Sequence, residues 1–509
     1  MRFFALAFLF LVQFQQAAIA QEKSKEAAAP VAPPKKLQLP DLLKAIQETY
    51  STSAPKDLLA MTTPEFQKIM TAATLETVFR AWKTRYGNWK DKLEEVKQVG
   101  PLHIYKVTAE RGTLRLRLTL DDTYHLKGIG LLPAFLDDLP AKVDLPIVKQ
   151  RLSEAARSTL TNYQVPSISL ALVKGDQIVW KDSFGYQNLS HHIPADADTA
   201  YITGSILKVV VATALMQQVD AGKLDLDAPV NNYLKGFQVP NPFEKEQKLT
   251  TRHLLSHHGG VPNGAQMVSL WRRELPLNLD EVVRKRVRVT RKPGESFQYS
   301  NYGFALNGYL LAQLQAVPFE KALSKSLLEP LDMKSTVFEP APGMLENLAV
   351  PYANSGLERK VAATGFRRLD VYPAGDAFST PADMARFLIP HLNEGKYQGK
   401  QILSAKAVKE MATLQFPAKD ARSGVGLGWM INNIRGRKLL WHNGAVPGFF
   451  TYIAINPDKK SGVVLFCNKY NPLEGGLGLL ADPLVDLREL AIELLDRLEP
   501  AQLSSRIPW

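Results

Sequence analysis

The sequence predicts an α+β protein in which a small α+β domain precedes a larger domain built from an antiparallel sheet flanked by helices. A chain of 509 residues exceeds the size of one ordinary domain, so two or three domains are expected. Strand patterns stand at both ends of the region 145–498, while helical patterns fill its middle. A composition of 45% hydrophobic and 22% charged residues is typical of globular rather than disordered proteins.

Residues 1–20 have the pattern of a secretory signal peptide. Arg2 supplies the positive end, residues 3–12 form an unbroken apolar run, and Ala18-Ile19-Ala20 is an A-x-A cleavage site. The apolar run is too short to span a membrane. We therefore expect a periplasmic or secreted protein with no stable membrane anchor after signal cleavage. A linker rich in Ala, Pro and Lys is expected at 21–39.

Residues 40–133 are expected to form the small α+β domain. Helical patterns come first and strand patterns follow, which predicts helices packed on an antiparallel meander. This order resembles that of the cone-shaped domains of the NTF2-like superfamily. No cluster of acidic residues, histidines or serines suggests chemistry here, so a binding or spacer role is favoured over catalysis. The expected helices are 42–50, 63–72 and 75–86, and the expected strands are 102–109, 113–120 and 124–131.

A linker at 134–144 leads to the main domain, 145–498, and a tail follows at 499–509. The turn Lys174-Gly175-Asp176 predicts a hairpin near the start of this domain. Cys467 is the only cysteine, so no intramolecular disulfide is possible, and its apolar strand pattern predicts a buried thiol. The expected helices are 148–163 and 483–498, and the expected strands are 168–173, 177–181, 439–442, 449–455 and 462–467.

The formal charge of +12 is a modest excess for this length and does not require a nucleic-acid partner. The densest basic run is 284–292. A solvated surface strand or loop is the favoured interpretation of this run, and a surface for acidic lipid or polymer is the alternative. The sequence contains no recognisable nucleic-acid-binding motif, so no nucleic-acid partner is expected.

Ser205 and Lys208 are the first candidate catalytic residues. They stand at the start of a stretch, 201–216, whose second half is apolar almost all round and predicts a buried helix. Positions i and i+3 share a helix face, so the hydroxyl and the amine can meet. A buried lysine activates a neighbouring serine, and a helix N-terminus offers N–H groups and positive potential to developing negative charge.

Tyr299 and Asn301 are candidate partners of this pair. Because they are two residues apart in a loop or extended segment, their side chains are expected to point the same way. A phenol beside Lys208 would be drawn toward the phenolate and would take a proton from Ser205. Asn301 would orient Lys208 or hydrogen-bond a substrate amide.

The stretch His442-Asn443-Gly444-Ala445 supplies candidate substrate and oxyanion groups. Gly444 has no side chain, so the backbone of Ala445 can approach a ligand closely. The N–H groups of Ala445 and Ser205 would form an oxyanion hole. His442 would hydrogen-bond the substrate or the tyrosine.

Three further histidines, His253, His257 and His258, raise the question of a metal site. No carboxylate or cysteine stands at matching spacing, and the adjacent His257 and His258 would diverge on a helix, so no metal site is expected. The favoured interpretation is a helix end with a Gly-Gly loop beside the site.

Together these motifs resemble those of the serine β-lactamase/penicillin-binding-protein-like superfamily, in its class C β-lactamase, esterase and D,D-peptidase branch. Ser205-x-x-Lys208, Tyr299-Ser300-Asn301 and His442-Asn443-Gly444 match the three motifs in order. The resemblance implies a β-lactamase-like fold, with an antiparallel sheet flanked by helices, an all-helical part and a site between the two. Supporting stretches are 253–262, 373–385 and 426–429.

The resemblance also implies the chemistry, which is acyl transfer through a serine ester with no metal or organic cofactor. Ser205 would attack a carbonyl, Lys208 and Tyr299 would shuttle the proton, and the Ser205 and Ala445 amides would hold the oxyanion. His442 is a departure, because β-lactamases of this branch usually carry lysine there. A mostly neutral histidine holds a substrate carboxylate less firmly, which favours esterase or peptidase work over β-lactam hydrolysis.

The substrate class stays open among small esters, D-amino-acid peptides of a peptidoglycan-like material and β-lactams. The alternative to catalysis is a non-catalytic protein that binds a cell-wall fragment or a partner in the same cleft. The complete set of Ser205, Lys208, Tyr299 and His442 argues against that alternative. The sequence does not predict the oligomeric state.

Overall fold

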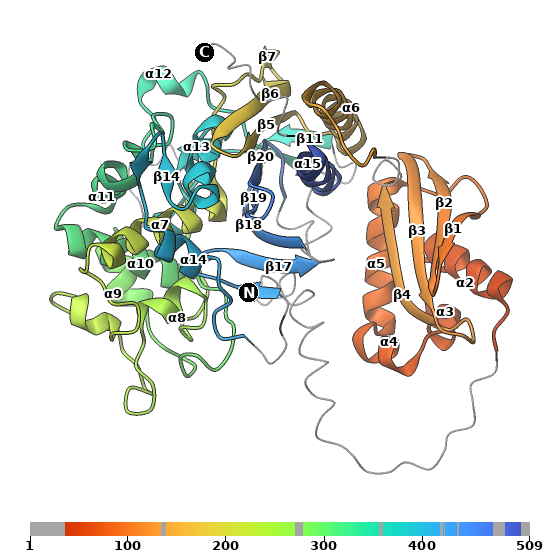
Figure 1. Cartoon of the computed structure of the whole chain (residues 1–509), viewed down its shortest axis with the longest axis horizontal. Coiled ribbons are helices and arrows are strands. Elements are labelled where there is room, and N and C mark those ends of the chain that lie inside the picture. The colour runs from red at the N-terminus through yellow and green to blue at the C-terminus, as the bar shows by residue number, and fades with distance from the viewer. Residues whose placement is uncertain are drawn as a thin grey trace. The chain divides into compact units, whose positions relative to one another are not determined.

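The computed structural model describes residues 36–133, 139–269, 278–355, 360–417, 421, 423–434, 437–471 and 484–499. They fall into two compact units, one ending at Ala141 and one beginning at Lys142 (Figure 1). The predicted signal peptide, most of the first linker and all but one residue of the tail lie outside the described residues. Among the helices that the structure describes, none is long and apolar enough to cross a membrane.

In the described part of the smaller unit, helices precede an antiparallel sheet with the strand order β1-β2-β3-β4. Leu114, Leu116 and Leu118 of β3 are buried in a core that the helices share, as their alternation predicts. Two elements were not predicted: α3, which has only five residues, and β1, whose Glu-rich sequence lacks apolar alternation. The bounds are α2 Leu39–Thr52, α3 Lys56–Ala60, α4 Pro64–Ile69, α5 Ala72–Tyr86, β1 Glu94–Val99, β2 Leu102–Ala109, β3 Gly112–Leu120 and β4 Leu126–Pro133.

The main sheet of the larger unit is antiparallel, and its described strands have the order β16-β17-β18-β19-β20-β5-β6-β7. Leu465 of β20 lies opposite Leu170 of β5, so strands from the two ends of the domain pair with each other, as predicted. Cys467 ends β20 and is buried, also as predicted. The strand bounds are β5 Ser167–Lys174, β6 Gln177–Asn188, β7 Ile193–Pro194, β16 Ser423–Val425, β17 Met430–Ile434, β18 Arg437–Val446, β19 Phe449–Asn456 and β20 Ser461–Cys467.

Helices cover both faces of this sheet. α6 (Leu145–Tyr163) and α15 (Val485–Arg497) pack on one face and contact each other, and α13 (Pro381–Leu392) packs on the other (Figure 1). The predicted α+β class and the antiparallel sheet flanked by helices are thus confirmed.

The middle of the chain is mostly helical. The helices here are η3 Gly204–Ile206, α7 Leu207–Asp220, η4 Val230–Tyr233, α8 Thr251–Leu255, α9 Leu279–Arg286, α10 Asn301–Gln315, α11 Phe319–Leu323, η5 Ser324–Leu328, α12 Pro342–Leu345, η6 Tyr372–Ala374 and α14 Ala405–Met411. Short strand pairs connect them, namely β8 Tyr201–Ile202 with β13 Phe378–Ser379, β9 Met267–Ser269 with β12 Arg367–Leu369, β10 Tyr352–Ser355 with β11 Lys360–Ala363, and β14 Lys396–Tyr397 with β15 Lys400–Gln401. The first part of the basic run 284–292 ends α9 rather than forming the strand or loop expected of it.

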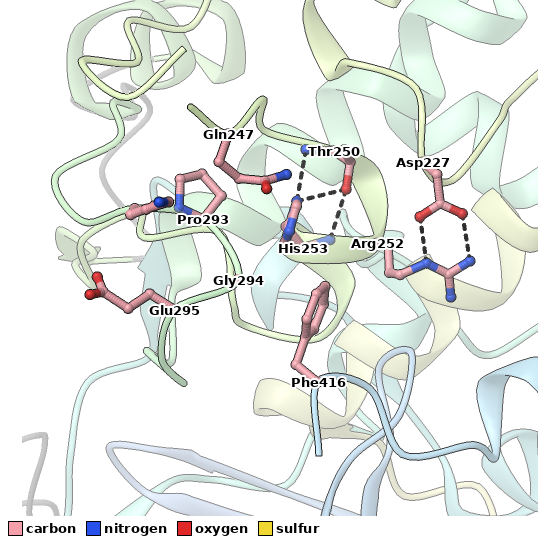
Figure 2. A pocket seen from close by; sticks show the side chains of 10 residues that line it. Asp227, Gln247, Thr250, Arg252, His253, Pro293, Gly294, Glu295 and Phe416 are labelled. Atoms are coloured by element: carbon pink, nitrogen blue, oxygen red, sulfur yellow. Dashed lines mark hydrogen bonds and ion pairs between the residues drawn. The ribbon is translucent and has the colours of Figure 1, made fainter. Parts of the chain in front are cut away.

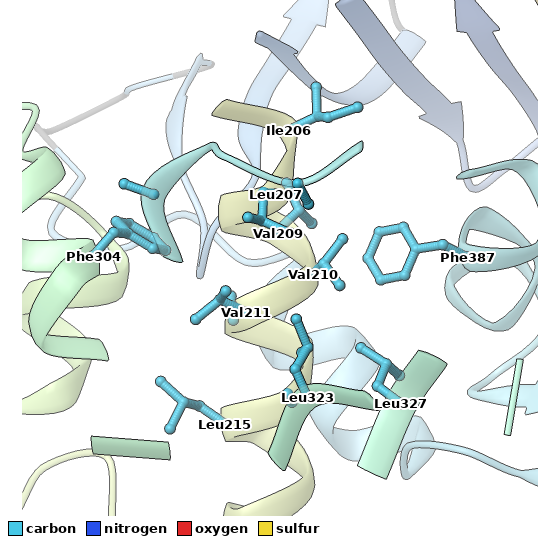
Figure 3. Packing of buried hydrophobic residues seen from close by; sticks show 14 of the residues in the cluster. Ile206, Leu207, Val209, Val210, Val211, Leu215, Phe304, Leu323, Leu327 and Phe387 are labelled. Atoms are coloured by element: carbon cyan, nitrogen blue, oxygen red, sulfur yellow. The ribbon is translucent and has the colours of Figure 1, made fainter. Parts of the chain in front are cut away.

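α7 is buried on every side, as its apolar sequence predicts. Val210 and Leu215 have no exposed surface, and Phe304 of α10 and Phe387 of α13 lie on opposite sides of the helix (Figure 3). Burial of one large aliphatic side chain contributes roughly 1.5–3 kcal/mol. The helix that follows Ser205 is therefore held firmly by its core.

Candidate active site

Ser205 lies in η3, a short 3-10 turn that leads directly into α7. Its side chain is partly exposed, whereas Lys208 is completely buried. A hydrogen bond of 2.9 Å joins Lys208 Nζ to Ser205 Oγ. The predicted contact of the two side chains is present, although a 3-10 turn rather than an α-helix places Ser205.

The amine of Lys208 also donates a hydrogen bond of 2.5 Å to the Ala374 carbonyl. Burial lowers the pKa of Lys208 well below its usual range, which favours the neutral amine. A neutral amine has two N–H donors and one lone pair. It can therefore keep its bond to Ala374 while the lone pair accepts the proton of Ser205.

The Ala374 carbonyl is a functional group that the sequence analysis missed, because a backbone carbonyl has no residue-type signature. Its only signal was the supporting stretch 373–385. Two residues further on, Asp376 Oδ2 lies 2.6 Å from Arg368 Nε in a buried ion pair. The next carbonyl, that of Ala377, accepts a hydrogen bond from the Thr203 amide at 2.8 Å. This segment therefore ties the acceptor of Lys208 to the residues just before Ser205.

Tyr299 lies in a loop just before α10 and forms a side-chain hydrogen bond with Ser205. Lys208 Nζ is 5.0 Å from the centre of the Tyr299 ring. Burial raises the pKa of the Tyr299 phenol above its usual range. The expectation that Lys208 draws the phenol toward phenolate is therefore wrong, because burial disfavours the charged form of both groups. Tyr299 is a neutral phenol that can donate a proton as well as relay one.

His442 lies on β18 and is buried, with its ring centre 6.4 Å from that of Tyr299. Its Nδ1 lies 2.8 Å from the Asn443 carbonyl oxygen, which only accepts, so Nδ1 carries the ring proton. Its Nε2 is a buried acceptor without a hydrogen-bond partner among the described residues. Burial, with a smaller effect of Lys208, lowers the pKa of His442 to about 3. The histidine is thus neutral at neutral pH, and the expected bond to Tyr299 is not formed.

Two glycines bring the Ser205 segment against β18. Gly204 has a φ of +55°, and a Cβ on it would lie 2.8 Å from the Ala445 nitrogen. A Cβ on Gly444 would lie 2.0 Å from the Thr203 carbonyl oxygen. Only glycine fits at these close approaches. The amides of Ser205 and Ala445 therefore belong to two backbone segments in direct contact, as the predicted oxyanion hole requires.

Asn301 stands at the start of a helix. It is the first residue of α10, and Ser300 is the N-cap, whose Oγ accepts a hydrogen bond from the Gly303 amide at 2.8 Å. Among the described residues no hydrogen bond joins Asn301 to Lys208. The carbonyl of Ala374 orients the amine instead, and only the predicted role of Asn301 toward a substrate stays open.

The three clustered histidines face three different surroundings. His253 forms a capping box with Thr250 at the start of α8, and its ring stacks on Phe416 with 4.9 Å between ring centres. His258 Nδ1 donates to the Ser256 carbonyl at 2.8 Å. The ring centre of His257 lies 4.3 Å from that of Tyr299. The described residues contain no group of three side chains that could hold a metal ion.

A cavity of about 630 Å³ opens beside α8, and His253 and Phe416 face it (Figure 2). Arg252 lines the cavity but is engaged in hydrogen bonds to both carboxylate oxygens of Asp227, at 2.6 and 2.8 Å. Neither Ser205 nor Lys208 lines this cavity. Its other lining residues are Gln247, Thr250, Lys292, Pro293, Gly294 and Glu295.

Comparisons with known proteins identify the family of the chain. The Beta-lactamase family model matches residues 150–481. Protein flp of Staphylococcus aureus (strain N315) is 24% identical over 323 residues, which are 63% of this chain and 63% of that protein. The chain thus spans less than two thirds of the length of this curated relative.

Solved structures share the fold. The octameric penicillin-binding protein homologue from Pyrococcus abyssi is 26% identical, with a TM-score of 0.54 over 68% of this chain and 77% of that chain. The D-amino acid amidase from Ochrobactrum anthropi SV3, complexed with L-phenylalanine amide, is 22% identical. Its TM-score is 0.55 over 68% of this chain and 99% of that chain.

Proposed function

Because the chain belongs to the Beta-lactamase family of hydrolases and has the β-lactamase-like fold that its motifs predict, we propose that it is an exported serine hydrolase working through an acyl-enzyme on Ser205. The hydrogen bond between the partly exposed Ser205 and the completely buried Lys208 carries this proposal. A lysine that burial keeps neutral is a base, and the hydroxyl beside it becomes a nucleophile.

Acylation begins when Ser205 Oγ attacks the carbonyl carbon of the substrate and its proton passes to the lone pair of Lys208 Nζ. The new Oγ–C bond leaves negative charge on the former carbonyl oxygen, which the Ser205 and Ala445 amides stabilise. The bond to the leaving group then breaks, and Tyr299 gives its proton to that group. Tyr299 recovers a proton from Lys208 by way of the site's hydrogen bonds. In deacylation water takes the place of the leaving group: its oxygen bonds to the acyl carbon as its proton passes through Tyr299 to Lys208, and the Oγ–C bond then breaks as Ser205 recovers a proton from Lys208.

The charge of the site favours uncharged acyl groups. His442 stands where a lysine would provide a fixed cation, and its lowered pKa keeps it neutral at neutral pH. A substrate carboxylate therefore gains little from this position. We rank small neutral esters and amides first, D-amino-acid peptides second and β-lactams last.

The test is steady-state turnover of p-nitrophenyl esters, a D-Ala-D-Ala peptide and nitrocefin. Ser205→Ala is expected to lose on the order of 10³-fold or more in kcat. The matched control is Ser158→Ala, which removes an exposed serine on α6 and is expected to keep full activity. Undiminished turnover by Ser205→Ala would overturn the mechanism, and nitrocefin as the fastest substrate would overturn the ranking.

A further inference from the structure

We propose that His257 is a positioning residue that fixes Tyr299 beside Ser205. The inference rests on the proposed function and adds to it a residue outside the three motifs. His257 follows α8, is 2% exposed and has a φ of +59°. A side-chain-bearing residue adopts this left-handed conformation at a cost in free energy, and such outliers cluster at functional sites.

His257 holds the backbone on both sides of Tyr299. The amide of Gln298 donates to the His257 carbonyl at 2.7 Å, and the amide of Ser300 donates to His257 Nδ1 at 3.1 Å. One residue thus binds the amide before Tyr299 and the amide after it. The peptide units that carry the tyrosine are fixed by this pair of bonds.

The ring of His257 also packs against the tyrosine itself. The ring centres of His257 and Tyr299 are 4.3 Å apart, with 31° between the ring planes. The ring centre of Phe304, on α10, lies 5.1 Å from that of His257. The imidazole therefore lies between the core and the phenol. Its place limits rotation of the Tyr299 side chain as well as movement of its backbone.

The hydrogen bonds fix the state of the imidazole. Since Nδ1 accepts from the Ser300 amide, the ring proton is on Nε2. Burial, followed by Lys208, His442 and His258, lowers the pKa of His257 well below its usual range. Protonation of Nδ1 would replace its acceptor by a donor and break the bond to Ser300. Because His257 and Lys208 are both neutral, they do not repel each other electrostatically.

Two substitutions test the bond from the Ser300 amide to His257: His257→Gly also loses the ring that packs on Tyr299, whereas His257→Asn restores an acceptor without that ring. His257→Gly removes the acceptor while keeping a residue that tolerates positive φ, and His257→Asn keeps an acceptor oxygen near the position of Nδ1 and also tolerates this φ. His258→Asn is the matched control, since its Nδ1 binds the Ser256 carbonyl and its ring packs on Phe416.

The readout is single-turnover acylation by a p-nitrophenyl ester, with thermal melting to confirm folding. His257→Gly is expected to slow acylation on the order of 100-fold with little change in substrate affinity, because a misplacement of about 1 Å has this effect. His257→Asn is expected to recover most of that loss, and His258→Asn to acylate as wild type does. Equal rates for wild type and a folded His257→Gly would overturn the proposal.

A double-mutant cycle with Tyr299→Phe tests whether His257 acts through the tyrosine. If it does, His257→Gly has little further effect once the phenol is gone. Fully additive losses would show instead that His257 supports the fold in general.

Hydrogen exchange separates this proposal from the proposed function. The Ser300 amide is expected to exchange faster in His257→Gly than in wild type, whether or not Ser205 is acylated. If no acyl-enzyme forms while this exchange rises, the proposed function fails and the lock on Tyr299 stands. Unchanged exchange of the Ser300 amide contradicts the lock.

Discussion

Gly444→Ala tests the contact between the Ser205 segment and β18. A Cβ at this position would lie 2.0 Å from the Thr203 carbonyl oxygen and 2.3 Å from Thr451 Oγ1, whereas real Cβ contacts are essentially never shorter than 3.0 Å. Thr203 cannot turn away easily, because its carbonyl accepts from Thr451 Oγ1 at 2.5 Å and its amide donates to the Ala377 carbonyl. The added methyl group therefore pushes the Ser205 segment and β18 apart by about 1 Å.

This displacement is expected to slow acylation by about 100- to 1,000-fold. A misplacement of about 1 Å at a reacting group costs about 100-fold. Loss of one oxyanion donor costs about 100- to 1,000-fold, which is about 2.7–4 kcal/mol of transition-state stabilisation. The free energy of unfolding is expected to fall by only about 1–3 kcal/mol, as for other overpacked sites, so the variant should remain folded.

The assay is single-turnover acylation with a p-nitrophenyl ester, together with urea unfolding. Gly462→Ala is the matched control, because the tightest contacts of its Cβ would be with two side-chain methyl groups, Leu388 Cδ1 at 3.2 Å and Ile455 Cγ2 at 3.3 Å, and not with backbone. That variant lies in the same sheet and is expected to acylate at the wild-type rate. An unchanged rate in folded Gly444→Ala would refute the close approach of Gly444 and Gly204 as the basis of the oxyanion site.

Three further predictions concern the buried Lys208 and the ion pair between Arg368 and Asp376. Lys208→Met is expected to lose at least about 100-fold in acylation. It should nevertheless melt at a higher temperature than wild type at pH 7. Between the lowered pKa of the folded Lys208 and the unfolded value of 10.5, the lysine must lose its proton on folding, which lowers wild-type stability at pH 7, and a methionine does not have this cost. Wild-type kcat/KM is expected to fall as pH drops through that lowered pKa, since only the neutral amine accepts the Ser205 proton; a flat pH–rate profile would contradict this role. Arg368→Met leaves the carboxyl of Asp376 buried without its partner and is expected to lower the free energy of unfolding by about 3–5 kcal/mol, as urea titration will measure. Wild-type stability in that titration would mean that the pair does not anchor the Ala374 segment.

The sequence predicted well those features that depend on residue type and spacing. The apolar run after Ser205 became a buried helix, and the i, i+3 spacing placed Lys208 at hydrogen-bond distance from the serine. Strand patterns at the two ends of the domain predicted one sheet built from both ends, and the pairing of β20 with β5 agrees with that. The helix and its i, i+3 contact need no knowledge of the rest of the fold, because local periodicity determines them.

The features that the sequence did not predict depend on tertiary contacts. The acceptor of Lys208 is a backbone carbonyl more than 160 residues away, which no residue pattern identifies. The charge of Tyr299 depends on how deeply the fold buries the phenol, and burial outweighs the hydrogen bond to Ser205. Ser300 before an apolar stretch is a helix-start signal, and it places Asn301 at the start of α10, where its role toward a substrate stays a prediction.

The contacts of His257 likewise depend on tertiary structure and not on residue spacing. His257 was predicted to lie at a helix end beside the site, and its place after α8 agrees with that. Its two bonds to the amides around Tyr299 join segments about 40 residues apart, so spacing alone cannot predict them. The clustering of three histidines drew attention to His257 as a possible metal ligand, whereas its surroundings in the structure are those of a hydrogen-bond acceptor.

The most direct test of the central claim is mass spectrometry of the protein quenched during turnover of a p-nitrophenyl ester. We expect a mass increase equal to one acyl group, located by peptide mapping on Ser205 and absent from Ser205→Ala. An adduct on another residue, or the same adduct on Ser205→Ala, would contradict the central claim.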